Sequence, residues 1–205
     1  IDDFAVFVFS TGEALVYQGD DPENSLRWSS AGRFQIGEPL GIRAHCKVGG
    51  TEIILTKDGW LDISTALSGG RLSEASTYSD KIISAAKAAA NQYAAFFGWE
   101  CFYYPAGNLF IANIPRSAFA PIPGGGGTEW AIQSEQHARN TSTGAWCRFV
   151  GWEATTFAVW KDVLYFASGG KIYTGDIGTS DDGGPIYIEC IPAFNALNAK
   201  GKRKQ

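Results

Sequence analysis

The amino-acid sequence predicts an all-β protein made of β-propeller-like blades, partial or complete, with one inserted amphipathic helix near residues 78–96. Three observations lead to this prediction. Aromatic residues make up 14% of the chain and glycine supplies 25 of its 205 residues, a composition typical of β-strands joined by tight turns. Short apolar runs recur between such turns, and one alanine-rich segment has helical periodicity instead. We expect a single β-propeller-like domain over residues 1–205, or a fragment of one.

The first third of the chain has the pattern of β-hairpins. Two runs rich in aromatic and β-branched residues, Phe4–Phe9 and Ala14–Tyr17, flank a turn that contains Gly12, and together they predict a hairpin. A polar loop follows at residues 19–24, and then the same pattern returns. The strands expected from it are Ala44–Val48, Glu52–Thr56 and Trp60–Ile63.

Two segments, Trp28–Ile63 and Trp146–Tyr173, share one order of features. Each has a Trp, then Arg-Phe, then two strands around a turn, a Gly turn and a short strand. A further hairpin is expected between them, from Trp99–Tyr104 and Leu109–Asn113. Weak repeats of roughly 30 to 40 residues favour the blades of a propeller. A β-sandwich is the alternative, since counting strands does not separate the two folds.

The segment at residues 73–97 interrupts this pattern and predicts the inserted helix. Its expected apolar face consists of Ile82, Ala86, Ala89, Ala90, Tyr93 and Phe97. Residues 77–80 (Thr-Tyr-Ser-Asp) resemble a capping box, and Gly98 provides a stop signal. We therefore expect the helix to run from Tyr78 to Phe96 and to lie against a blade or a neighbouring subunit.

Two further segments are predicted to be irregular. Residues 118–128 form a Pro/Gly loop with four consecutive glycines, which we expect to be flexible because glycine loses much backbone entropy on ordering. The loop lacks the Lys-Ser/Thr and the following helix of a P-loop. The last residues, 199–205, form a basic tail that we expect to be solvated.

Charge and composition disfavour several classes of protein. The formal net charge of −4 and the pI of about 5.2 argue against a surface that grips nucleic acid. No apolar run approaches the roughly 20 residues of a membrane-spanning helix. The chain has no methionine and begins at Ile1, so we expect it to be a piece of a longer protein.

Four cysteines are spread along the chain, each in a strand-like stretch. They are Cys46, Cys101, Cys147 and Cys190. Because no CxxC pair occurs, zinc binding is disfavoured, and we expect buried free thiols, as in a protein that matures in a reducing cytosol.

Residues that could carry chemistry are few. His45 and His137 lack a metal-like partner at i+2 or i+4, so we expect neither a metal site nor a cofactor. No GxSxG motif predicts a serine hydrolase. The carboxylates that could form a glycosidase pair are Asp20, Asp21, Glu153, Asp181 and Asp182, of which the four aspartates stand in turn sequences.

Two other sets of side chains complete the search. The arginines that could hold an anion, as in a sialidase, show no clustering in the sequence; they are Arg27, Arg33, Arg43, Arg71, Arg116, Arg139 and Arg148. Tryptophans that could stack on sugar rings are Trp60, Trp99, Trp130 and Trp152, although aromatics at strand ends more often pack between blades. The sequence therefore assigns no catalytic, cofactor-binding or metal-binding residue.

Blocks that cover most of the chain carry a resemblance to a known family. They are Gly12–Pro22, Trp28, Gly32–Gly41, Ile54–Gly59, Ser79–Ile82, Phe97–Glu100, Tyr104–Leu109, Asn140–Trp152, Leu164–Phe166 and Ser180–Gly183. The most specific of them is Asn140–Trp152. In these blocks the chain resembles the tail nozzle, or packaged-DNA stabilisation, proteins of short-tailed phages, which are longer than this chain. Since the motifs belong to the scaffold of the fold, no functional residue is carried over.

The resemblance implies a non-enzymatic structural protein of the virion tail, assembled in the host cytoplasm. It implies a homo-oligomeric ring, expected to be a hexamer, below the portal and adaptor and in contact with other tail proteins. Packaged DNA would be retained above the ring and pass through it without sequence-specific binding. A carbohydrate-binding or carbohydrate-active propeller, either a lectin or a glycosidase, is the alternative, and an adhesin-type interaction module is a third.

Overall fold

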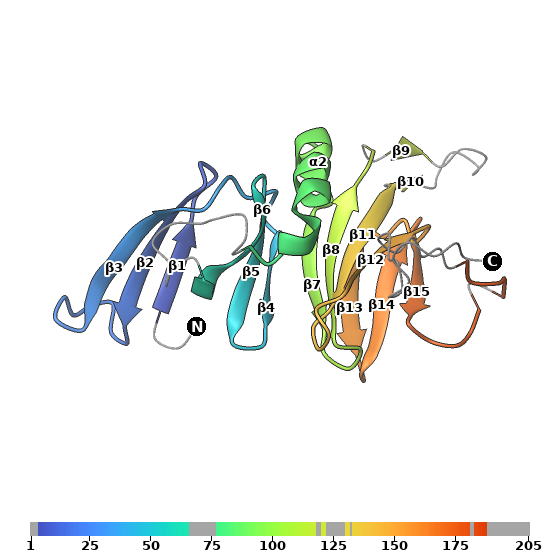
Figure 1. The fold of residues 1–205 in the computed structure, drawn as a ribbon. Coiled ribbons are helices and arrows are strands. Elements are labelled where there is room, and N and C mark those ends of the chain that lie inside the picture. Colours follow the sequence, from blue (N-terminus) through green and yellow to red (C-terminus); the bar gives the residue numbers. More distant parts are fainter. Residues whose placement is uncertain are drawn as a thin grey trace, which may run out of the picture.

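The computed structural model confirms a predominantly β protein. It describes residues 4–65, 77–117, 120–121, 130–131, 133–180 and 183–187. In this part of the chain, four antiparallel sheets of three or four strands follow one another in sequence order, and an 11-residue α-helix packs among them. Figure 1 shows the sheets as a row that runs from the N-terminal to the C-terminal end. Over these residues the row does not close into a propeller or a barrel.

The first sheet has the order β1-β2-β3. Its strands are β1 (Phe4–Val8), β2 (Glu13–Gly19) and β3 (Trp28–Gln35). The predicted hairpin is confirmed, since β1 pairs with β2 in antiparallel register. Its turn requires glycine at residue 12, where φ is +80° and a Cβ would come closer than 3.0 Å to the backbone of Gly37. This close approach fixes the turn against the connection to the second sheet.

The second and fourth sheets are three-stranded meanders of the same order. Their strands are β4 (His45–Val48), β5 (Thr51–Thr56) and β6 (Gly59–Asp62), and β13 (Thr156–Trp160), β14 (Val163–Ser168) and β15 (Lys171–Gly175). Each meander follows a strand that opens with the repeated tryptophan, Trp28 on β3 or Trp146 on β12 (Trp146–Val150). The predicted repeat therefore consists of the last strand of one sheet and the whole of the next.

The third sheet has four strands in the order β12-β11-β8-β7. The other three are β7 (Glu100–Tyr104), β8 (Leu109–Pro115) and β11 (Ser134–Asn140). Between β8 and β11, the two-residue β9 (Ala120–Pro121) pairs with β10 (Trp130–Ala131). Apart from β9, the loop predicted at residues 118–128 lies outside the described residues, as does the basic tail at 199–205.

Each sheet packs its faces on the sheets that neighbour it in the chain. On β5, Ile54 faces the first sheet, whereas Ile53 and Leu55 face the third. Because alternate residues of a strand point to opposite faces, a strand between two neighbouring sheets must be apolar at consecutive positions. This requirement explains why Ile53, Ile54 and Leu55 are each at most 5% exposed.

The third and fourth sheets meet in an aromatic cluster. Phe157 and Phe166 of the fourth sheet pack against Tyr104 and Ile111 of the third. Trp152, in the connection between the two sheets, stacks on Phe166 with ring centroids 4.8 Å apart. An apolar core therefore lies between every pair of successive sheets in the row.

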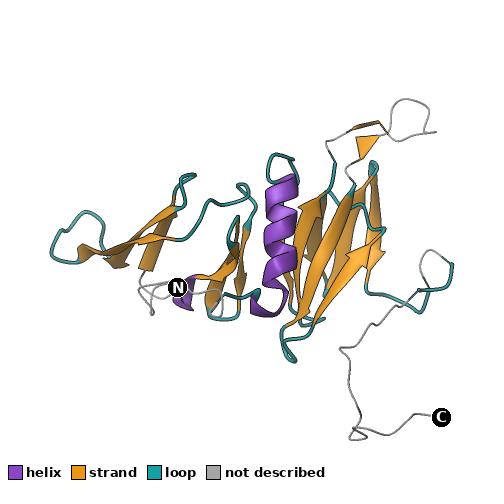
Figure 2. Ribbon diagram, turned by 45° about the horizontal axis from the view of Figure 1, so that its top comes forward, coloured by secondary structure: helices purple, strands orange, loops and turns teal. Residues whose placement is uncertain are grey.

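The inserted helix is present but shorter than predicted. It consists of η2 (Asp80–Ile82) and α2 (Ile83–Tyr93), and it buries Ala86, Ala89 and Ala90 against the core between the second and third sheets. Figure 2 shows α2 lying beside the strands of the third sheet. The helix packs against sheets of its own chain, since α2 contacts β6 and β8; whether these sheets are blades stays a prediction. None of the helices in the described residues has the length and apolar character needed to cross a bilayer.

Two details of the helix prediction are wrong. Phe97 is 71% exposed, because the helix ends at Tyr93 and the following turns carry Phe97 away from the core. The expected capping box does not form: neither η2 nor α2 has a side-chain hydrogen bond at its cap. The Ser79 hydroxyl instead accepts a hydrogen bond from the backbone N–H of Trp60, at 3.0 Å.

Candidate functional site

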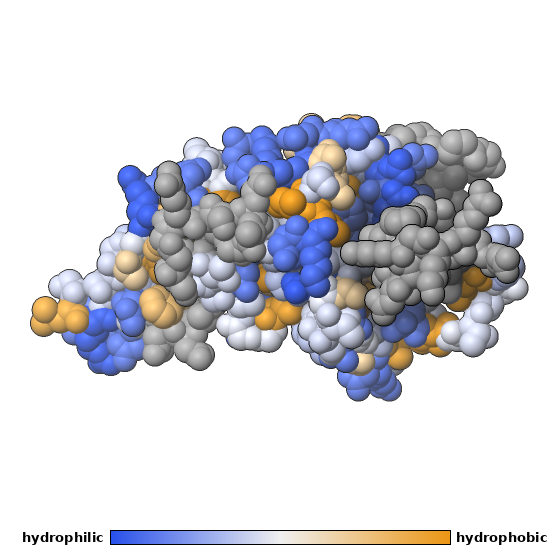
Figure 3. All heavy atoms as spheres, in the orientation of Figure 1, coloured by the Kyte–Doolittle hydropathy of each residue, from blue (hydrophilic) through white to orange (hydrophobic). Residues whose placement is uncertain are grey.

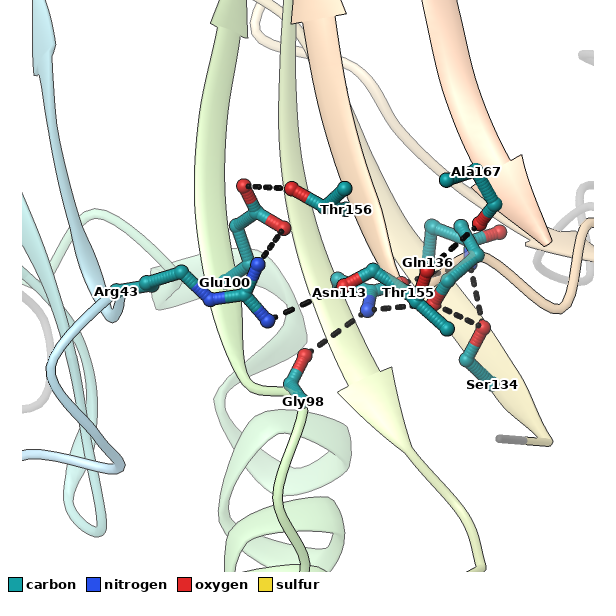
Figure 4. Close-up of polar contacts among 10 residues, drawn as sticks. Arg43, Gly98, Glu100, Asn113, Ser134, Gln136, Thr155, Thr156 and Ala167 are labelled. Atoms are coloured by element: carbon teal, nitrogen blue, oxygen red, sulfur yellow. Dashed lines mark hydrogen bonds and ion pairs between the residues drawn. The ribbon is translucent and has the colours of Figure 1, made fainter. Parts of the chain in front are cut away.

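A group of buried polar side chains lies where the second, third and fourth sheets meet, as Figure 4 shows. Glu100 opens β7 and is 7% exposed. One of its carboxylate oxygens lies 3.3 Å from Arg43 Nη1, and the other accepts a hydrogen bond of 3.1 Å from the Thr156 hydroxyl. Arg43 also donates to the carbonyl of Thr155, at 3.1 Å. We call these four residues the Glu100 cluster.

The Glu100 cluster connects three sheets through one carboxylate. Arg43 precedes β4, Glu100 belongs to β7 and Thr156 opens β13. Burial raises the pKa of the Glu100 carboxyl, whereas Arg43, and after it the Thr156 hydroxyl, act to lower this pKa. Since both oxygens already face partners within the protein, the group is arranged to hold sheets together.

A second set of buried polar groups extends this junction. Asn113 is fully buried and donates to the carbonyls of Gly98 and Ala154, both at 3.0 Å. Gln136 donates in turn to the Asn113 side-chain oxygen, at 2.9 Å, and to the Ser134 hydroxyl, at 3.2 Å. Ser134 Oγ then donates to the carbonyl of Ala154, at 3.1 Å. The two carbonyls that accept these hydrogen bonds belong to Gly98, which lies between α2 and β7, and to Ala154, which lies in the connection to the fourth sheet.

Two arginines that seemed unrelated in the sequence meet at a third cluster. Arg116 Nη1 lies 3.5 Å and Arg148 Nη1 lies 3.8 Å from Oε2 of Glu135, which is 8% exposed. The other oxygen of Glu135 lies 3.8 Å from His137 Nε2. The arginines show no clustering in the sequence, but β-sheet pairing brings these two, far apart in the chain, to one carboxylate.

His137 is a buried and neutral histidine. Its side chain is 7% exposed, and burial, together with the nearby charge of Arg148, lowers the pKa of His137 to about 4. Its ring lies 6.0 Å from that of Trp60, and its Nδ1 atom has no hydrogen-bond partner. No group of three or more candidate metal ligands occurs within the described residues. The imidazole thus serves as part of the core.

An open cavity of about 630 Å³ lies between the first and second sheets. Most of its lining is apolar, including Val6, Val8 and Ile54, and its polar residues are Ser10, His45 and Glu52. His45 Nδ1 lies 2.7 Å from Glu52 Oε1, a contact similar to the one that orients the histidine in a hydrolase triad. No hydrogen bond joins Ser10 to His45 in the described part of the chain, so the nucleophilic step has no geometric support. Local sequence spacing gave no signal for this pair.

The carboxylates considered for a glycosidase have structural partners. Asp20 forms an ion pair with Arg27, and Asp21 accepts a hydrogen bond from the backbone N–H of Glu23, at 3.2 Å, as an Asx turn does. Glu153 accepts from the backbone N–H of Ser134, at 2.7 Å. The predicted turn chemistry is confirmed for Asp21. Residues 181 and 182 lie outside the described residues.

The tryptophans considered for sugar binding pack between the sheets. Trp60 is fully buried and Trp99 is 3% exposed, and their rings meet edge to face with centroids 6.0 Å apart. Trp152 stacks on Phe166. The sequence favoured a packing role over sugar binding, and the structure shows these three tryptophans packed between sheets. The side chain of Trp130 lies outside the description.

Three of the four cysteines are described, and all three are free thiols, as predicted. Cys101 is buried and Cys46 is half-buried, but Cys147 is exposed, so the expectation of burial is wrong for Cys147. Cys46 Sγ and Cys101 Sγ lie 2.8 Å apart, across the boundary between β4 and β7. Burial, and after it the neighbouring thiol, raises the pKa of Cys101 well above its usual value. Cys190 lies outside the described residues.

Comparison with known proteins does not place the chain in a family. No protein-family model matches it, and no curated protein matches it. The resemblance to phage tail nozzle proteins therefore stays a prediction, and a function must be argued from the fold and from the clusters described above.

Proposed function

We propose that this chain is a non-enzymatic structural part of a tailed-phage virion, of the tail nozzle type, and that its sheets are blades of a β-propeller. One observation supports this role above the others. The sheets follow chain order, and every apolar core lies between successive sheets. Blades arranged around an axis have this pattern, since each blade contacts its two neighbours.

The buried polar clusters support a structural role over a catalytic one. The carboxylate of Glu100 and the amide of Asn113 contact groups of the protein itself, on three sheets. A catalytic group needs a free atom directed at a space where substrate binds. The Glu100 carboxylate instead contacts groups of the protein itself: one oxygen accepts a hydrogen bond from Thr156, and the other, which has no hydrogen-bond partner, lies within ion-pair distance of Arg43.

The distribution of charge supports passage of DNA without tight binding. Five of the six described arginines form an ion pair with a carboxylate, and the chain as a whole is acidic; the five are Arg27, Arg33, Arg43, Arg116 and Arg148. Every phosphate that a protein neutralises adds salt-dependent retention of DNA. A nozzle that holds packaged DNA and then releases it rapidly should therefore lack free cations along its channel.

The proposed place of the protein follows the family resemblance. Copies of the full-length protein would form a ring below the portal and adaptor, in contact with other tail proteins, and DNA would leave through it. The decisive experiment is a nonsense mutation in the gene of a phage that encodes this chain. We expect mutant particles to package DNA and then lose it, and wild-type protein supplied in trans to restore retention.

Two results would contradict the proposal. One is a mutant phage that keeps its DNA and its infectivity; the other is absence of the protein from purified virions by mass spectrometry. A fluorescence anisotropy titration of the isolated chain with a short DNA duplex adds a third criterion. Tight binding that weakens steeply with salt would mean a DNA-gripping surface, against the expectation of weak binding.

The enzymatic alternative has its own control. If the cavity residues Ser10 and His45 formed an active site, the purified chain would hydrolyse p-nitrophenyl esters, and Ser10→Ala would abolish the activity. We expect hydrolysis at the buffer background for the wild type and the variant alike. Binding of the wild-type chain to a glycan array, for example through the exposed Trp160, would instead favour a lectin.

A further inference from the structure

The open cavity between the first and second sheets has the properties of a small-molecule binding site, which the proposed structural role does not use. Its volume of about 630 Å³ lies within the range of roughly 300–1,000 Å³ that ligand sites occupy. β1 contributes Val6 and Val8 to one wall, and β5 contributes Ile54 to the other. Sites of this kind combine an apolar lining with a few polar groups that fix the orientation of the ligand.

The apolar lining continues the core between the two sheets. Val6 and Val8 alternate along β1, so both side chains point toward the second sheet, where they pack on the core cluster that contains Ile54 and Ile63. Both valines are only partly buried. On the face of the molecule that Figure 3 shows, hydrophobic side chains of the described residues reach the surface in small, separate groups between hydrophilic ones. A concave and mainly apolar lining is therefore a local feature of the chain.

Two polar residues of the lining contact each other on neighbouring strands. His45 opens β4 and Glu52 lies on β5, with His45 Nδ1 2.7 Å from Glu52 Oε1. Because an ionised carboxylate only accepts hydrogen bonds, Nδ1 carries the proton and donates it to Oε1. The side chain of Glu52 is 30% exposed, and its Oε2 atom has no hydrogen-bond partner among the described residues. One carboxylate oxygen is thus held in place and the other can accept from a ligand.

The charge of the lining selects the kind of ligand. Glu52 is the only Asp, Glu, Lys or Arg among the described residues that line the cavity. Lys47 is the partner of Glu52 in the strand register, but it does not line the cavity, and the part of the chain that the structure describes shows no ion pair between them. A single carboxylate beside an apolar space attracts a cation and repels an anion. The cavity therefore complements an apolar molecule with a cationic head.

We propose that this cavity binds a small amphipathic amine. The alkyl chain packs on Val6, Val8 and Ile54, and the ammonium group donates a hydrogen bond to Oε2 of Glu52. His45 is a positioning residue, because its contact with Oε1 fixes the direction of the carboxylate. Binding of this kind needs no nucleophile, so it is distinct from the ester hydrolysis considered above. The inference goes beyond the proposed structural role and does not depend on it, so either can fail without the other.

The test compares three ligands that share an octyl chain and differ in the head group. Octylammonium, octan-1-ol and octanoate are each titrated into the 205-residue chain by isothermal titration calorimetry, at mildly alkaline pH and below the concentrations at which they form micelles. We expect octylammonium to bind one to one and at least about tenfold more tightly than octanoate, with octan-1-ol between them. Shortening the ammonium ligand to hexyl and butyl should weaken binding by up to about fourfold for each methylene removed.

Three variants assign the binding to the cavity. Glu52→Gln removes the charge but keeps the shape, so the affinity for octylammonium should fall to that for octan-1-ol. Glu23→Gln is the matched control and should bind as the wild type does, because it removes the same charge from an exposed residue of the β2–β3 loop that does not line the cavity. Val8→Trp should abolish binding of all three ligands by filling the cavity. Near-ultraviolet circular dichroism checks folding, and Ser10→Trp replaces Val8→Trp if that variant is not folded.

Four results would overturn the proposal. They are the absence of a saturable heat of binding with octylammonium, octanoate that binds as tightly as octylammonium, Glu52→Gln that binds octylammonium as tightly as Glu23→Gln does, and binding that survives in the folded variant with a filled cavity. None of them bears on the virion test. A protein absent from virions that still binds octylammonium through Glu52 would refute the proposed function alone.

Discussion

Acidification should destabilise this protein through His137. In the folded chain the pKa of His137 is about 4, whereas an unfolded chain restores the ordinary value of 6.5. Because the folded pKa is the lower one, the neutral ring contributes its full stability above about pH 6.5, and that contribution is lost as the pH falls toward 4. Each pH unit between the two values corresponds to about 1.4 kcal/mol, so the loss reaches about 2 kcal/mol at pH 5 and about 3 kcal/mol at pH 4.

The groups that face His137 make the cause specific. Glu135 on the same strand lies 3.8 Å away, Arg148 on β12 opposes a second positive charge, and Trp60 closes the other side. Urea unfolding of the wild type and of His137→Gln, at several pH values between about 7.5 and 4.5, gives the free energy of unfolding of each protein. The effect is the difference between the two proteins in how this free energy changes with pH. His45→Gln is the control, because the side chain of His45 is 61% exposed.

The reasoning predicts that His137→Gln loses about 2 kcal/mol less stability than the wild type between pH 7.5 and pH 5. Other groups titrate in both proteins and cancel in the comparison. Among them is Glu100, whose raised pKa favours the folded state as the pH falls. Equal losses in the wild type and in His137→Gln would refute the assignment, and so would an equal benefit from His45→Gln.

Three further changes test the scaffold, each by urea unfolding at neutral pH. Glu100→Ala should cost about 3 kcal/mol, because it leaves a partly buried arginine without its carboxylate; replacing that arginine by Met in the same chain should recover part of the loss. Gly12→Ala should cost more than Gly49→Ala, since both have positive φ but a Cβ meets backbone only at residue 12; equal costs would contradict the close approach. In a variant whose other two cysteines are serine, oxidised glutathione should oxidise Cys46 and Cys101 to a disulfide and release two molecules of reduced glutathione. Closing the loop between them should raise the free energy of unfolding by about 4 kcal/mol. An unchanged midpoint and no loss of about 2 Da in mass would contradict the pairing.

Several strands could be predicted because they depend on local sequence, but β11, the strand that carries His137, was not predicted. The run from Ile53 to Leu55, bounded by turns with Gly50 and Gly59, has the pattern of a strand buried on both faces. The matched order of features after Trp28 and Trp146 predicted two units that the structure shows as equivalent meanders. Period, turn residues and β-branched content were sufficient for these elements.

The contacts that build the clusters were invisible in the sequence for a physical reason. Arg43 and Glu100, or Cys46 and Cys101, are brought together by sheet packing, not by spacing along one element. The capping box predicted at residues 77–80 fails because η2 begins only at Asp80, which puts Ser79 at the N-cap. The Ser79 hydroxyl accepts a hydrogen bond from the backbone N–H of Trp60, 19 residues away, so a long-range partner replaces the local one. Local rules hold only where tertiary contacts do not compete for the same atom.

Local pattern also does not determine whether the second face of a strand is covered by another sheet. A strand with apolar residues on both faces has the same sequence whether its second neighbour belongs to its own chain or to another molecule. In the fourth sheet, Phe166 and Tyr165 are adjacent, and within the described residues only Phe166 packs in a core cluster with another sheet. In the second sheet, Ile53 and Ile54 are likewise adjacent, and both meet one. The local pattern is the same in the two sheets, so it does not tell whether the second face of a strand meets another sheet.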